Sequence, residues 1–261
     1  MDLALRGKVA IVTAASRGLG KACAQALATE GMAVAMAARD AETLRRLVSE
    51  LTAQGGEALA LPCDISDPAV PESLVAAALE RWGRLDALVV STPGPPLMAC
   101  LDLTEEVWTQ AMEMNCTVPI RLTRAVLPTM RASGGGRIVY IGTIGTRMVQ
   151  PGMVLSNATR LALVGYAKTL SLEVAADNVL VNTVAPGPIA TERMDDLASQ
   201  MASRLGVSDE DALQLWVDEV PLARMGRPQD LANIVALLVS EASCYVTGAV
   251  IPIDGGKAPT Y

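Results

Sequence analysis

Short runs of apolar, β-branched residues alternate along the chain with longer segments in which apolar residues recur at helical spacing. The short runs predict strands at residues 8–13, 32–37, 57–62, 85–90, 137–142, 179–184 and 249–254. The longer segments predict helices near residues 18–30, 40–54, 67–82, 104–131, 155–176 and 228–240. Strands that are apolar on both faces and separated by helices form parallel sheets with helices on both sides. The sequence therefore predicts a doubly wound α/β fold.

No internal repeat, low-complexity tract or Pro/Gly-rich linker divides the chain, so we expect one domain over residues 1–261. Residues 188–225 break the rhythm, because polar and apolar residues are mixed there between a strand end and the last helix. Such an insertion usually covers a ligand site, so we expect a helical lid. Its apolar side chains suit either a hydrophobic or acyl ligand or ordinary packing. They are Met194, Leu197, Met201, Leu205, Leu213 and Trp216.

The net charge of −7, with no run of Lys or Arg, argues against nucleic acid and against an anionic membrane surface as partners. A small-molecule substrate remains the default expectation. Five scattered cysteines without a C-x-x-C pair favour reduced thiols, and neither a targeting segment nor a long apolar run is evident. We therefore expect a cytoplasmic protein. The chain has no histidine, which excludes a histidine base, a Ser-His triad and a His-ligated zinc site.

The first predicted strand leads into a helix through the sequence TAASRGLG, residues 13–20. Gly18 and Gly20 let backbone amides approach a pyrophosphate, and the helix N-terminus supplies positive potential. Ala14 stands where a first glycine is expected, and two glycines alone are weak evidence for a nucleotide site. A tight turn between a strand and a helix is the alternative.

The end of the second predicted strand points to the kind of nucleotide. Where a carboxylate would bind the ribose 2′-hydroxyl of NAD, the chain has Ala38 and Arg39, and Arg17 projects from the glycine loop. Two guanidinium groups favour a 2′-phosphate and therefore NADP(H), with solvated arginines as the alternative. After the third strand, Asp64 is placed either to accept from the adenine amino group or to cap the next turn.

Several further segments occur in a characteristic order, and together they carry a resemblance. They are TAASRGLG, CDIS, MEMNC, GGGRIVYIGT, ALVGYAKTLSLEVA, NVLVNTVAPGPIAT, ARMGRPQDLANIVALLVS and YVTGAVIPIDGG. Over its whole length the chain resembles short-chain dehydrogenases/reductases, most closely the branch named for 3-oxoacyl-[acyl-carrier-protein] reductases. The resemblance implies an open Rossmann-type sheet of seven parallel strands, NAD(P) bound across the switch point of the sheet, and a homotetramer.

Carried onto this sequence, the family pattern gives a set of expected cofactor-binding residues. They are Thr13, Ser16, Arg17, Gly18, Leu19, Gly20, Arg39, Asp64, Ile65, Gly94, Arg160, Pro186, Gly187, Ile189 and Thr191.

The chain departs from the family at the positions that matter most for catalysis. The segment 91–94 reads S-T-P-G instead of N-N-A-G. The family's catalytic Asn, Ser, Tyr and Lys align with the residues Asn115, Thr143, Ser156 and Arg160. This pattern is similar to an atypical subgroup of 3-oxoacyl reductase-like proteins, in which both the glycine motif and the catalytic tetrad are imperfect.

The chemistry of the family explains why these departures matter. Its tyrosine gives a proton to the carbonyl oxygen that receives hydride, with a pKa lowered by the lysine. Ser156 is a far weaker acid and too short to replace the phenol, although it can hold a water or substrate. Arg160 can still hold the nicotinamide ribose and stabilise an oxyanion. Thr143 keeps a hydroxyl group. The resemblance implies that Asn115 lies at a kink in its helix and binds a water molecule there.

Structural explanations stand beside these functional ones. Ser156 and Asn157 are good N-cap residues, Arg160 can pair with a carboxylate, and Thr143 is ordinary at a strand end. Tyr140 and Tyr166 are poor substitute acids, because strand alternation turns Tyr140 away from Thr143 and ten helical residues separate Tyr166 from Ser156.

Three functions are consistent with the sequence. The first is an NADP(H)-dependent oxidoreductase that acts on a carbonyl/alcohol pair or an activated double bond. The 2,4-dienoyl-CoA reductases are similar in placing a serine at the tyrosine position, although they keep the lysine. The second is a non-redox lyase resembling halohydrin dehalogenases, which pair their tyrosine with an arginine but fill the nucleotide pocket. The third is a catalytically silent nucleotide-binding subunit.

Overall fold

The protein is described by a computed structural model that covers residues 2–260. Seven parallel strands form one sheet in the order β3-β2-β1-β4-β5-β6-β7. The strands are β1 (Val9–Thr13), β2 (Ala33–Ala38), β3 (Glu57–Pro62), β4 (Ala87–Val90), β5 (Gly136–Ile141), β6 (Val179–Pro186) and β7 (Val250–Ile253). Each begins and ends within two residues of its expected position, and the predicted doubly wound Rossmann-type sheet of seven strands is confirmed.

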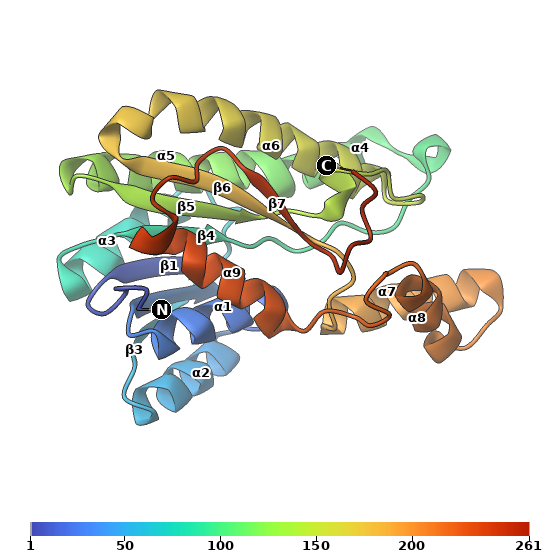
Figure 1. Ribbon diagram of the computed structural model, residues 1–261, viewed down its shortest axis with the longest axis horizontal. Helices are drawn as coiled ribbons and strands as arrows, with labels where there is room; N and C mark the ends of the chain where they lie inside the picture. The colour runs from blue at the N-terminus through green and yellow to red at the C-terminus, as the bar shows by residue number, and fades with distance from the viewer. Residues whose placement is uncertain (1, 261) are drawn as a thin grey trace.

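Helices cover both faces of the sheet (Figure 1). One face carries α1 (Gly18–Thr29), α2 (Ala41–Ala53) and α9 (Pro228–Val239), and the other carries α3 (Val70–Trp82), α5 (Val118–Ala132) and α6 (Val154–Glu173). Alternate residues of β1 serve the two cores: Ala10 and Val12 pack on the first face, and Val9 and Ile11 pack on the second. This alternation is why the strands are apolar at every position.

The prediction of one continuous helix over residues 104–131 is wrong, because the helix is interrupted. The structure has α4 (Glu105–Met112), a π-helical turn (Glu113–Thr117) and then α5. Pro119 lacks the N–H that would continue an α-helical ladder across this point. Asn115 sits in the π turn, and its side-chain Nδ2 donates to the carbonyl oxygen of Ala111 at 3.0 Å. The irregularity fits the helix kink expected at Asn115.

The expected lid forms two helices, α7 (Glu192–Leu205) and α8 (Asp209–Asp218), which lie beyond the carboxyl end of β6 (Figure 1). They pack on each other through a small alanine cluster of Ala198, Ala202 and Ala212. Backbone hydrogen bonds join the two ends of the lid, since the Gly226 nitrogen donates to Pro188 oxygen at 2.9 Å. The two ends of the lid are therefore joined at its base, while the side chains of Arg193 and Arg204 also contact the loop after β4.

Short 3-10 turns complete the architecture at Cys100–Asp102, Ile144–Thr146, Ala175–Asp177 and Glu241–Ser243. Within the described part of the chain, none of the helices combines the length and the apolar character that a membrane crossing requires.

Candidate active site

A cleft opens at the carboxyl ends of the strands, where the strand order reverses between β1 and β4. This is the position at which open α/β sheets bind ligands. Most of the residues expected at the site meet here. The main cleft is lined by Arg17, Gly18, Leu19, Gly94, Thr143, Ser156, Arg160, Pro186, Gly187, Ile189 and Thr191. A neighbouring recess is lined by Ser16, Arg17, Arg39, Asp64 and Ile65.

Three of the expected residues lie behind the cleft instead of lining it. Thr13 is fully buried, and its Oγ1 donates to the Ser91 carbonyl at 2.7 Å while accepting from the Ser91 nitrogen at 2.9 Å. It therefore ties β1 to the loop that follows β4. Asn115 is buried below that same loop and accepts a hydrogen bond from Thr92 Oγ1 at 3.1 Å. Gly20 is the third, buried in the first turn of α1.

The glycine loop owes its shape to close backbone packing. A Cβ at Gly20 would lie 2.7 Å from the Thr13 carbonyl oxygen and closer still to the Ala14 carbonyl, so only glycine fits. Gly18 has a φ of +54°, in the left-handed region. Ala14 also has a positive φ, of +48°, which costs an alanine about 1–2 kcal/mol. A glycine at this position would carry no such strain.

The recess beside the glycine loop holds both expected arginines, and both side chains are exposed. It also contains Asp40, a carboxylate one residue beyond Arg39 that the sequence did not predict at this site. Asp40 caps α2: its Oδ1 accepts from the Thr43 nitrogen at 3.0 Å and its Oδ2 from Thr43 Oγ1 at 2.6 Å. Those hydrogen bonds lower the pKa of Asp40, so it stays ionised and directed at the helix.

Asp64 caps the turn that follows β3, which was one of the two roles that the sequence predicted for it. Its Oδ1 accepts from the nitrogen and the hydroxyl of Ser66, at 3.0 and 2.7 Å, and these bonds lower its pKa. The carboxylate also lines the recess, so this hydrogen bonding is compatible with a contact to a ligand.

Arg160 is a buried cation at the inner end of the main cleft. Its Nη1 donates to the backbone carbonyl of Ile141 at 2.9 Å, and within residues 2–260 it forms no salt bridge. The alternative explanation, that Arg160 pairs with a carboxylate, is therefore wrong. Burial, and to a smaller extent the charge of Arg193, lowers the pKa of Arg160 to about 10, so the group stays charged near neutrality.

Ser156 is buried and lines the cleft one helical turn before Arg160. Helix α6 begins at Val154 after Met153, and neither Ser156 nor Asn157 caps it, so the N-cap explanation is wrong. The side chain of Asn157 instead donates to the Gln150 carbonyl at 2.9 Å. Helix capping therefore does not explain Ser156, whose side chain is placed in the lining of the cleft.

Thr143 both caps a short turn and lines the cleft. Its Oγ1 accepts from the Gly145 nitrogen at 3.2 Å and so begins the 3-10 turn after β5. The same residue lines the cleft beside Ser156 and Arg160. The structure therefore brings three of the four aligned catalytic positions to one wall, with Asn115 behind them.

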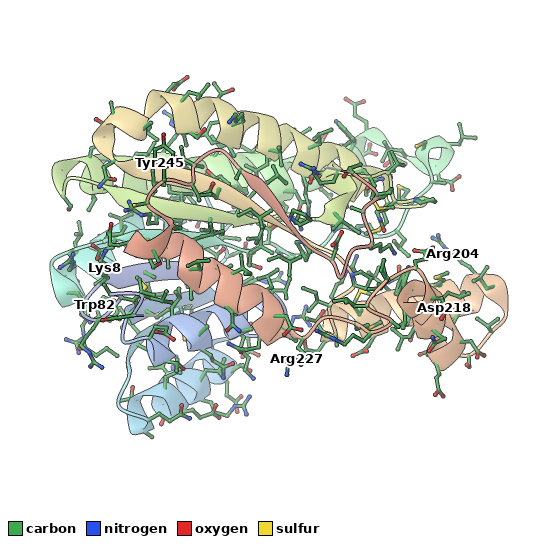
Figure 2. All side chains as sticks on the ribbon, viewed as in Figure 1. Lys8, Trp82, Arg204, Asp218, Arg227 and Tyr245 are labelled. Atoms are coloured by element: carbon green, nitrogen blue, oxygen red, sulfur yellow. The ribbon has the colours of Figure 1, made fainter. Side chains whose placement is uncertain are left out.

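None of the tyrosines in residues 2–260 lines the main cleft. Tyr140 is fully buried against Thr123, 2.5 Å between the two hydroxyl oxygens, and burial raises its pKa. Tyr166 packs on the core of the α5 and α6 face, where burial also raises its pKa. Tyr245 is fully exposed at the opposite end of the molecule from the lid (Figure 2). These positions agree with the expectation that Tyr140 and Tyr166 are poor substitute acids.

The lid contributes residues that the sequence identified only in part. Met194 and Leu197 line the main cleft, and Trp216 joins them in a small adjoining cavity. Met201 and Leu213 pack instead on the alanine cluster within the lid, and Leu205 is half exposed. Arg193 also lines the cleft and was missed. It follows T-E in the first turn of α7, which the sequence reads as an ordinary polar lid segment.

Comparison with known proteins gives consistent results. The family model described as "Enoyl-(Acyl carrier protein) reductase" matches residues 13–258. The human protein "Dehydrogenase/reductase SDR family member 4" is 34% identical over 253 residues, covering 97% of this chain and 88% of its own. A 3-oxoacyl-[acyl-carrier-protein] reductase from Synechocystis is 34% identical over 255 residues, covering 97% of this chain and 98% of its own.

Solved structures agree with the sequence relatives. L-Sorbose reductase from Gluconobacter frateurii, crystallised with NADPH and L-sorbose, superposes with a TM-score of 0.94 at 31% identity, covering 100% of both chains.

Proposed function

Because the chain belongs to the short-chain dehydrogenase/reductase family, we propose that it is an NADP(H)-dependent oxidoreductase with an atypical active site. It would interconvert a carbonyl and an alcohol, or reduce an activated double bond. The observation that carries the proposal is Arg160, a buried, charged guanidinium that has no carboxylate partner among residues 2–260 and lines the cleft with Ser156 and Thr143. A buried cation without a partner is costly unless a ligand uses it.

The cleft and its recess fit a dinucleotide. Gly18 and Gly20, at the start of α1, would hold the diphosphate on backbone amides. Arg17 and Arg39 would hold a 2′-phosphate in the recess, because Ala38 offers no acceptor there and Asp40 is engaged by α2. Structure neighbours crystallised with NADPH support the phosphorylated cofactor. When bound, the cofactor supplies the hydride of a reduction.

The chain's own residues would orient the reactants and stabilise charge. Arg160 keeps its link to the Ile141 carbonyl with one N–H and offers further donors to ribose hydroxyls or to a substrate oxygen that becomes negative. The hydroxyls of Ser156 and Thr143 would position the substrate or a water molecule. No tyrosine lines the cleft within the described residues, so water or the substrate itself would supply the proton.

The substrate end of the cleft favours a hydrophobic or acyl molecule. Met153, Met194 and Leu197 line the wall beyond Ser156, and Trp216 closes the cavity that adjoins it. Unbranched methionine side chains adapt to ligands of different shape. The 3-oxoacyl reductase among the relatives is compatible with such a substrate.

A second candidate is a catalytically silent nucleotide-binding subunit, which the absence of a tyrosine from the cleft lining of residues 2–260 favours. The recess with Arg17 and Arg39 weighs against a lyase that fills the nucleotide pocket. Calorimetry with NADPH followed by turnover on a panel of ketones and enones separates the candidates. The oxidoreductase requires NADPH binding and turnover, and Arg160→Ala should weaken both, whereas Ser156→Ala should affect turnover alone. Binding without turnover on any compound would favour the silent subunit.

We also propose that the protein assembles as a homotetramer, as the family resemblance implies. Leu161 and Leu172 lie exposed on α6, at 51% and 71% of their surface, so this helix has apolar side chains left for a partner. Light scattering at micromolar concentration tests the proposal, and a stable monomer would contradict it.

A further inference from the structure

Arg193 crosses the cleft from the lid to the loop after β4. It stands in the first turn of α7, and its Nη2 donates to the carbonyl oxygen of Pro95. The guanidinium lies over Gly94, since a Cβ at that glycine would come 2.9 Å from Arg193 Nε and 3.4 Å from its Cζ. Any larger residue at position 94 would push Arg193 out of this position.

The main cleft around Arg193 contains an excess of positive charge. Arg17, Arg160 and Arg193 all line the main cleft, and within residues 2–260 none of them forms a salt bridge. Burial lowers the pKa of Arg193, while the charge of Asp196 raises it and that of Arg17 lowers it. Glu192 and Asp196 line the same cleft, so the five lining charges sum to one positive charge. Such a site favours an anion.

The neighbours of Arg193 indicate which anion. The lid residue Thr191 faces the glycine loop, with its methyl carbon 3.8 Å from where a Cβ of Gly18 would lie. Glu192 Oε2 lies 3.9 Å from the same point, and Arg193, the next residue, lies against Gly94 and lines the same cleft as Gly18. The N-terminus of α1, at Gly18, favours phosphate groups. Arg193 does not line the recess that contains Arg39, so the 2′-phosphate is not its partner.

We propose that Arg193 binds the diphosphate of the cofactor, and that this contact fastens the lid over it. The inference rests on the proposed NADP(H) binding. A guanidinium has five N–H donors, and the Pro95 carbonyl takes one of them, so enough remain for a two-pronged bond to a phosphate. The bond to Pro95 orients the group, and its place on α7 transmits cofactor binding to the lid.

The same helix provides a matched control. Arg204, near the end of α7, also donates to a carbonyl of this loop, that of Leu97 at 3.4 Å. Its side chain is exposed and it does not line the main cleft (Figure 2). Replacing Arg204 removes one positive charge and one contact between lid and loop while leaving the diphosphate position unchanged.

Calorimetric titration of wild type, Arg193→Gln and Arg204→Gln with three ligands tests the proposal. The ligands are 2′-AMP, 2′-phospho-ADP-ribose and NADPH, of which only the last two carry a diphosphate. Arg193→Gln should weaken the two diphosphate ligands equally, by about tenfold or more, and leave 2′-AMP unchanged. Arg204→Gln should leave all three unchanged. Equal affinities for NADPH in wild type and Arg193→Gln, or equal weakening of 2′-AMP, would overturn the proposal.

Hydrogen exchange of residues 192–218 provides a second readout. NADPH at saturating concentration should slow exchange there in wild type and in Arg204→Gln, and should slow it much less in Arg193→Gln. Equal slowing in all three proteins would show that Arg193 does not fasten the lid. If wild type binds none of the three nucleotides, the proposed function fails as well, whereas tight wild-type binding unaffected by Arg193→Gln removes this inference alone.

Discussion

The Arg160 guanidinium donates a hydrogen bond to the carbonyl oxygen of Ile141, 2.9 Å away, and thereby joins the first turns of α6 to the end of β5. A lysine would reach this region with one compact charge. The arginine instead keeps one N–H on the protein and directs others into the cleft, in the fixed plane of its guanidinium. In the proposed site, Arg160 therefore supplies a positive charge where the family resemblance places a lysine, and it adds an anchor to β5.

Cofactor preference is the first consequence that can be measured. Arg17 and Arg39 are the cations of the recess, so we expect tighter binding of NADPH than of NADH. Arg39→Ala should weaken NADPH by about tenfold or more and leave NADH nearly unchanged, because only the former carries a 2′-phosphate. Calorimetry with both cofactors gives the answer, and Arg45→Ala, an exposed residue outside the recess on α2, is the control. A preference that survives in Arg39→Ala would refute this assignment.

The glycine loop gives a paired prediction about stability. Gly20→Ala should lower the free energy of unfolding by about 1–3 kcal/mol, because the added Cβ meets the carbonyl oxygens of Thr13 and Ala14. Ala14→Gly should change it by about 1 kcal/mol or less, in the stabilising direction, because relief of the positive φ slightly exceeds the entropy lost by glycine. Urea denaturation of both variants measures the difference. Similar losses in the two would show that the loop geometry is not the one described.

Much of the fold followed from local patterns, since each strand is a short apolar run bounded by turn residues. The π-helical turn at Asn115 did not, because helical periodicity is nearly the same with and without one extra residue, and Pro119 alone did not reveal it. The resemblance nevertheless placed a kink at Asn115.

The site was predicted where one strand end or loop determines the position of a residue, as for Gly18, Ser156 and Arg160. Arg193 and Asp40 were missed because their place in the cleft depends on how distant segments meet: α7 against the loop after β4, and the start of α2 against the recess. No spacing rule within one segment carries that information.

The absent tyrosine leads to a prediction of gained activity. Ser156→Tyr together with Arg160→Lys would introduce the pair that the family resemblance places here, in a cleft that Thr143 also lines. A positioned proton donor contributes about 10²–10⁴-fold in rate, so ketone reduction by the double variant should rise by at least tenfold over wild type. Ser156→Phe with Arg160→Lys is the matched control, because it fills the same space without a hydroxyl. Equal rates in the two variants would show that the gain does not come from the acid.

Transfer of deuterium from NADPH labelled at the reactive nicotinamide carbon to the product tests the central claim most directly. The protein is incubated with each of the two C4-deuterated epimers and a panel of ketones and enones, and the products are analysed by mass spectrometry. The account predicts one deuterium on the carbon that is reduced, from one epimer only, and little transfer in Arg160→Ala. Tight NADPH binding with no deuterium in any product would contradict it and would make the protein a silent nucleotide-binding subunit.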